Sequence, residues 1–375
     1  MKPETTRANS HRCFLPPRIC LAVCLAALLL APHLRAQDVQ EKIEVDNLSR
    51  NFVVHLPRGY DSKQHYPVVV LLPGQNQEPD DMQRLTHFDQ LVADKNGIIT
   101  VYPNPTRGRW NIGVHQEQPA MAPRRGYGRH GGMGGGGYPG GGYPGGGGGY
   151  PGGGGGQSGG QNPNDSKNDS RNQPEPADDV AFLNQMLDQL ALKYSVDTHR
   201  IYATGLGDGG FMALRMGCEM ADRIAAIAPV GAALPKTMIC LPARPVSALF
   251  LNGTEDPIVP YGGGTYKPGQ FHVLSAEDSA KTWAKFDRCD EKPAQEKIQP
   301  LQKGEKEIKT FTFNGCHDNA QVVLYAVKDG GNTWPGGEQY MSEKEVGKTS
   351  NALNANETIW TFLSTRKIAD DSTGK

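Results

Sequence analysis

The chain lacks an excess of charge of either sign, and this absence excludes one class of partner. Its 39 Lys and Arg residues almost balance 40 Asp and Glu residues, so the formal net charge of the 375 residues is −1. Without a basic excess there is no general electrostatic attraction to nucleic acid, and we expect no nucleic-acid partner. Asp165 and Asp169 lack the spacing of a calcium-binding EF-hand loop. We therefore expect neither a metal nor a cofactor.

Long apolar runs are also scarce, and the apolar run near the N-terminus is short. Residues 19–31 form an unbroken apolar run that follows several basic residues, and it is too short to span a bilayer comfortably. The run 34–36 then offers a cleavage site before Gln37. This pattern predicts a signal peptide over residues 1–36 and a secreted or periplasmic chain without a stable membrane span. An uncleaved anchor is the alternative interpretation.

Cysteines are few after this segment. Of seven cysteines, four follow residue 36: Cys218, Cys240, Cys289 and Cys316. An even number in an exported chain indicates two disulfides. Of the three possible connectivities we favour Cys218–Cys240 with Cys289–Cys316, which pairs nearest neighbours. Free buried thiols are the alternative.

The rest of the chain alternates strand-like and helix-like segments. Apolar runs of strand length are predicted at 51–56, 68–72, 98–102, 201–204, 224–230, 246–251 and 322–327. Helices are predicted at 87–94, after Asp178-Asp179, at 211–216 and at 358–363. This alternation predicts one α/β domain over residues 37–368, with a mostly parallel sheet and helices on both faces, and a tail at 369–375.

Residues 122–177 interrupt this pattern with a Gly-, Tyr- and Pro-rich run followed by a polar stretch. Such a composition cannot bury enough apolar surface to offset chain entropy, so we expect a disordered insertion within the domain. A passive tether is the favoured interpretation. The alternative is a surface or matrix protein that acts through this insertion, for instance by stacking its tyrosines on sugars.

The run Gly205–Gly210 follows a predicted strand and precedes a predicted helix. This is the setting of the nucleophile elbow, G-x-S-x-G, whose tight turn needs small residues two before and two after the nucleophile. Gly205 and Gly209 meet that need. The position between them is Gly207, which has no side chain and cannot attack a carbonyl carbon.

Together these segments resemble the secreted polyhydroxybutyrate depolymerase and feruloyl esterase family of α/β-hydrolases. The resemblance covers about residues 45–365 apart from the insertion, and it is carried by the motifs 67–74, 101–103, 110–111, 178–183, 196–206, 227–230, 253–261 and 333–336. It implies an α/β-hydrolase fold. Members of the family are serine esterases that cut storage polyesters, or feruloyl and acetyl esters on xylan.

By position, the resemblance places the nucleophile at Gly207, the acid at Asp256 and the base at Asn332. The family has Ser and His at the first and last of these positions. It often has His-Gly where this chain has Pro73-Gly74. An asparagine can hydrogen-bond to Asp256 but cannot shuttle a proton near neutral pH. We therefore expect a pseudoenzyme, in which Asp256 is a relic or a turn former.

Residues expected at the binding cleft are Gly74, Gln75, Trp110, Asp208 and Trp334. The alternative for both tryptophans is an ordinary place in the core or rim. The leading hypothesis is a binding protein for a polyester, a feruloylated or acetylated polysaccharide, or a protein partner. The other is an active carboxylic-ester hydrolase with non-standard residues, for which Asp208 is the nearest possible nucleophile.

Overall fold

A computed structural model describes residues 36–114 and 176–369 of the chain. The expected signal peptide, almost all of the Gly-rich insertion and the last residues of the tail lie outside the described residues. Residues 36–114 and 177–369 belong to one unit of the fold. No helix within these ranges is long and apolar enough to cross a bilayer.

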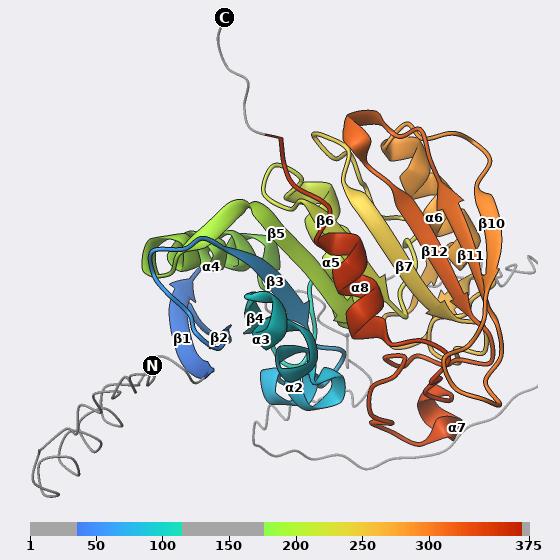
Figure 1. The fold of residues 1–375 in the computed structure, drawn as a ribbon, viewed down its shortest axis with the longest axis horizontal. Helices are drawn as coiled ribbons and strands as arrows, with labels where there is room; N and C mark the ends of the chain where they lie inside the picture. Colours follow the sequence, from blue (N-terminus) through green and yellow to red (C-terminus); the bar gives the residue numbers. More distant parts are fainter. Residues whose placement is uncertain (1–35, 115–175, 370–375) are drawn as a thin grey trace, which may run out of the picture. The chain divides into compact units, whose positions relative to one another are not determined.

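One sheet of ten strands organises the described residues (Figure 1). Its strand order is β1-β2-β4-β3-β5-β6-β7-β12-β11-β10. The strands are β1 (Gln37–Val45), β2 (Leu48–Leu56), β3 (Tyr66–Leu72), β4 (Ile99–Pro103), β5 (Val196–Leu206), β6 (Ala226–Val230), β7 (Ser247–Gly253), β10 (Ala294–Ile298), β11 (Ile308–Phe313) and β12 (Val322–Val327). The run from β4 to β12 is parallel, and both margins are antiparallel. The predicted mostly parallel sheet is confirmed.

Helices cover both faces of the sheet, as predicted (Figure 1). One face carries α4 (Asp179–Lys193), α5 (Asp208–Glu219) and α6 (Ala276–Phe286), and the other carries α2 (Pro79–Thr86), α3 (Asp94–Asn96) and α8 (Ala355–Leu363). A π-helical turn (Asp89–Ala93), a 3₁₀ turn (His317–Asn319), α7 (Glu343–Val346) and a small hairpin of β8 (Gly264–Tyr266) and β9 (Phe271–Val273) complete the fold. The helix predicted at 87–94 starts later, because His87 takes a left-handed conformation that ends α2.

The two sides of the insertion are held together at one place in the fold. The Asn111 side-chain amide donates to the Ala177 carbonyl oxygen at 2.9 Å. The Asp179 carboxylate accepts the Asn111 backbone N–H at 2.6 Å and forms a buried ion pair with Arg50 at 2.7 Å. Asp178 caps α4 by accepting the Ala181 backbone N–H. The described residues that precede and follow the insertion are therefore adjacent in the fold.

Both predicted disulfides are present. Cys218, in the last turn of α5, is bonded to Cys240, and Cys289 is bonded to Cys316. Cys218 and Cys240 are also buried. The nearest-neighbour pairing is confirmed.

We predict that replacing Cys218 and Cys240 by serine lowers the free energy of unfolding. The bond closes a loop with a sequence separation of 22 residues, and the chain-entropy model gives about 3 kcal/mol for a loop of that length. Thermal or denaturant unfolding of the purified variant measures the loss. The Cys289→Ser/Cys316→Ser variant should show a similar loss, because its bond closes a loop with a sequence separation of 27 residues. An unchanged midpoint in the first variant would contradict the prediction.

Candidate active site

The elbow after β5 has the backbone of a nucleophile turn. Gly207, between β5 and α5, has φ 56° and ψ −115°, which a residue with a Cβ adopts only with strain. The turn is tight because α5 meets the end of β3. A Cβ on Gly209 would lie 2.0 Å from the Leu72 carbonyl oxygen, and one on Gly205 would lie 2.6 Å from it. The requirement for small residues at both flanking positions is confirmed.

Asn332 faces this turn from the loop after β12. The residue is 2% exposed, and its Nδ2 donates to Asp256 Oδ2 at 2.8 Å and to the Gly231 carbonyl oxygen at 2.9 Å. Because both neighbours are acceptors, the amide cannot be turned around. Oδ1 therefore points to the elbow, where a Cβ on Gly207 would lie 3.1 Å from it. The structure brings the three expected triad positions together.

Asp256 holds Asn332 from the loop after β7. Its Oδ1 accepts the backbone N–H groups of Ile258 and Val259 at 2.8 Å each, while Oδ2 accepts from Asn332. Burial raises the pKa of this carboxyl to about 6, although the hydrogen bonds from Val259, Asn332 and Ile258 act in the opposite direction. Asp256 therefore shapes its own turn and also orients Asn332.

Asp208, the first residue of α5, is buried and already engaged. The Tyr266 hydroxyl donates to its Oδ1, and Arg109 Nε lies 3.6 Å from its Oδ2. Burial raises the pKa of Asp208, and these two partners oppose that rise. No sequence pattern indicated either partner, because Tyr266 lies in β8 and Arg109 in the loop after β4, both distant along the chain.

A pocket of about 190 Å³ opens between the elbow and the loop after β3. It is lined by Gly74, Gln75, Asn76, Gln77, Leu206, Gly207, Asp208, Ile258, Tyr266, Asn332, Tyr340 and Met341. We call it the elbow pocket. A second hollow of about 450 Å³ shares Gln75, Asn76, Gln77, Tyr340 and Met341 with it and so adjoins it. Gly74, Gln75 and Asp208, which the sequence analysis expects at the cleft, are thus among the residues that line the elbow pocket.

The two tryptophans expected at the cleft are not among the residues that line it. Trp110 is 5% exposed and donates from Nε1 to the Pro73 carbonyl oxygen at 2.9 Å. Trp334 is fully buried and donates to Asn356 Oδ1 at 2.8 Å. Neither ring is free to stack on a ligand, and the alternative of core packing applies to both. Trp110 instead fixes the start of the loop that carries Gly74.

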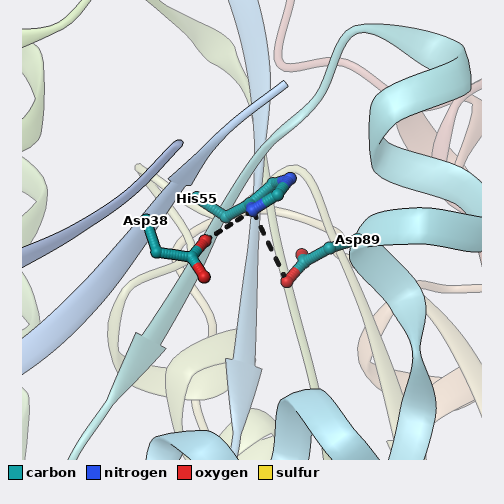
Figure 2. A group of neighbouring side chains, drawn as sticks. All are labelled: Asp38, His55 and Asp89. Carbon is teal, nitrogen blue, oxygen red and sulfur yellow. Dashed lines mark hydrogen bonds and ion pairs between the residues drawn. The ribbon is translucent and has the colours of Figure 1, made fainter. Parts of the chain in front are cut away.

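A second group of titratable side chains, none of which lines this pocket, comes from β1, β2 and the helical turn that begins at Asp89 (Figure 2). His55 Nδ1 is 2.6 Å from Asp38 and 3.8 Å from Asp89, and its Nε2 is 3.3 Å from Asp94. Burial favours the neutral imidazole, but the hydrogen bond with Asp38 and the charge of Asp89 outweigh it and raise the pKa of His55. Both ring nitrogens are therefore occupied by carboxylates, and the cluster ties β1 to β2 and to the helical turns beside them.

Two of the known proteins to which the chain is similar in sequence are named as esterases. The chain is 35% identical to "Feruloyl esterase B" of Piromyces equi over 162 aligned residues. These residues make up 41% of this chain and 29% of that protein. It is 30% identical to "Putative esterase NocK" of Nocardia uniformis subsp. tsuyamanensis over 200 aligned residues. These residues make up 51% of this chain and 58% of that protein. The match thus spans less than two thirds of either relative. No protein-family model matches the chain.

Among solved structures, a thermostable esterase aligns with a TM-score of 0.48 and 12% identity, over 89% of this chain and 63% of that chain. Three features define an α/β-hydrolase fold. They are the mostly parallel sheet, the elbow after β5, and the order along the chain, in which the elbow comes first, the acid position second and the base position third. The chain therefore has an α/β-hydrolase fold and is similar in sequence to proteins named as esterases.

We predict that the Asp256 carboxyl titrates near pH 6 in the folded protein, against an ordinary value of 3.8. Because the folded-state pKa is raised, its contribution to stability is complete below pH 3.8 and is lost as the pH rises through 6. The loss is on the order of 3 kcal/mol. Carboxyl-carbon NMR of aspartate-labelled protein measures the pKa, and the Asp256→Asn variant assigns the signal. A midpoint near 3.8 would refute the prediction.

Proposed function

We propose that this chain is an exported esterase relative that has lost serine-hydrolase chemistry and binds a ligand in the elbow pocket. The observation that carries the proposal is the arrangement of Gly207, Asn332 and Asp256. They occupy the positions of a triad, yet the first offers no hydroxyl and the second no imidazole. Two disulfides support export to an oxidising compartment, either outside the cell or the periplasm.

Ester cleavage by a triad needs a hydroxyl to attack and an imidazole to accept and return its proton. Loss of one such member costs on the order of 10⁶ in kcat, and loss of the second adds little, because the groups act as a unit. The frame around them is nevertheless intact: Asn332 keeps the hydrogen bond to Asp256 at 2.8 Å. A retained pocket without catalytic groups favours binding over turnover.

Asp208 does not replace the missing nucleophile in this proposal. A carboxylate that attacks must reach the substrate carbonyl carbon unencumbered, whereas this one accepts a hydrogen bond from Tyr266 and lies beside Arg109. Its place at the first position of α5 is also one residue beyond the point of the elbow. An active hydrolase with non-standard residues is thus the less supported candidate.

The ligand classes we propose come from the relatives. One matching protein is named a feruloyl esterase and another a bifunctional acetylxylan esterase/xylanase. A feruloylated or acetylated polysaccharide is therefore the leading candidate, ahead of a polyester or a protein partner. The amide side chains of Gln75, Asn76, Gln77 and Gln339 along the adjoining hollow suit a hydroxyl-rich chain.

We predict that the purified mature protein does not hydrolyse short-chain aryl or feruloyl esters above the uncatalysed rate. The Gly207→Ser/Asn332→His variant should gain activity by several orders of magnitude, because it restores both missing members to an intact frame. Each single variant should stay silent. Initial rates of aryl ester hydrolysis measure all four proteins.

The controls separate restored chemistry from a contaminant. Adding Asp256→Ala to the double variant should remove most of the gained activity, since the new imidazole loses its orienting carboxylate. Gly59→Ser is a matched substitution at a positive φ in open space and should stay silent. Turnover by the parent protein that Asp256→Ala abolishes would contradict the proposal. A double variant that folds but stays silent would contradict the intact pocket.

A further inference from the structure

Asn332 leaves one hydrogen-bonding atom unpaired beside the elbow pocket. Its Nδ2 is satisfied twice, by Asp256 and by Gly231, whereas no donor among the described residues meets its Oδ1. The residue is 2% exposed, and Oδ1 is directed at the open side of Gly207. Asn332 lies on the lining of the elbow pocket, so a ligand group that donates a hydrogen bond can pair with Oδ1 when it enters.

The opposite wall supplies donors. The first N–H groups of α5 have no partner within the helix, and Gly207 has no side chain to cap them. Asp208, whose backbone N–H is the first of these, lines the same pocket. The helix head therefore favours an acceptor atom on the ligand. The elbow pocket therefore offers hydrogen-bond donors on one wall, at the head of α5, and an acceptor on the other wall, at Asn332 Oδ1.

In an active serine hydrolase two oxygens on one carbon meet these two walls. The serine oxygen faces the base, and the oxyanion faces the backbone donors. Here the chain supplies no serine oxygen, so a ligand must bring both atoms itself. A carboxamide does so, because its oxygen accepts and its N–H donates. An ester or a carboxylate has no proton for Asn332 Oδ1.

We propose that the elbow pocket selects a neutral carboxamide, whose oxygen accepts from the head of α5 and whose N–H donates to Asn332 Oδ1. This inference rests on the proposed loss of hydrolysis. Among the proposed ligands it favours an N-acetylated polysaccharide or a peptide over a feruloyl or O-acetyl ester, because an ester carries no N–H group for Asn332 Oδ1. The pocket of about 190 Å³ has room for the amide and a small substituent. The adjoining hollow accommodates the remainder of a longer ligand.

The test compares three probes of one shape with the mature parent protein: benzamide, methyl benzoate and benzoate. Titration monitored by ligand-observed NMR gives each dissociation constant. Benzamide should bind at least about tenfold more tightly than either of the others, which leave Asn332 Oδ1 unpaired. Equal binding of benzamide and methyl benzoate would overturn the inference, and so would the absence of benzamide binding.

The Gly207→Ser variant tests the same point from the protein side. Its hydroxyl can donate to Asn332 Oδ1, so the tenfold preference for benzamide should disappear, still without hydrolysis because Asn332 accepts no proton. The matched Gly59→Ser control should keep the preference, and thermal unfolding confirms that both variants fold. A retained preference in folded Gly207→Ser would refute the role of Asn332. The parent comparison remains decisive if this variant does not fold.

Two further probes test which kind of molecule carries the amide group. N-acetylglucosamine represents an acetylated amino sugar, and N-acetylglycinamide represents a peptide. Competition with benzamide by either supports the inference, and failure of both overturns it. The same samples are assayed for methyl benzoate hydrolysis. Turnover by the parent would sink the proposed function, whereas equal probe binding without turnover would sink only the present inference.

Discussion

The close approach of α5 to the end of β3 is the constraint on which the site depends. The backbone at Gly209 lies so near the Leu72 carbonyl that any Cβ would overlap it, and Gly205 is restricted by the same oxygen. Gly207, between these two glycines, has a positive φ, and the first residue of α5 lines one pocket with Gly74. The elbow pocket therefore exists because of backbone packing, and it persists whether or not a nucleophile is present.

Within that frame, Asn332 is a stable substitute for a neutral imidazole. It gives Asp256 the hydrogen bond that the base of a triad would give, and it adds a second bond to Gly231. A buried carboxylate left without that donor would be costly, so an amide at this position can preserve the fold without being able to transfer a proton. Loss of function and retention of structure are therefore compatible at this position.

Sequence patterns predicted the centre of the molecule better than its margins. Continuous apolar runs marked β3, β4, β7 and β12, and glycine spacing located the elbow, because both signals are local. In the margins, the strand predicted at 51–56 is part of β2, whereas β1 and β10 escaped prediction because β10 is exposed along its whole length and β1 along most of it. The engagement of Asp208 by Tyr266 depends on contacts between distant segments. Trp334 was misplaced because nearness in sequence to a motif does not determine exposure.

The retention of Asp256 is explained by structure and says nothing by itself about catalysis. One of its oxygens orders the turn after β7 by accepting the N–H groups of Ile258 and Val259, and the other positions Asn332. Both interactions act in the folded protein whatever stands at Gly207. Under the proposed loss of hydrolysis, the nucleophile and base positions lack the side chains that would serve only chemistry, whereas Asp256 also holds a turn. That division is expected when demand for turnover is lost while demand for a folded pocket remains.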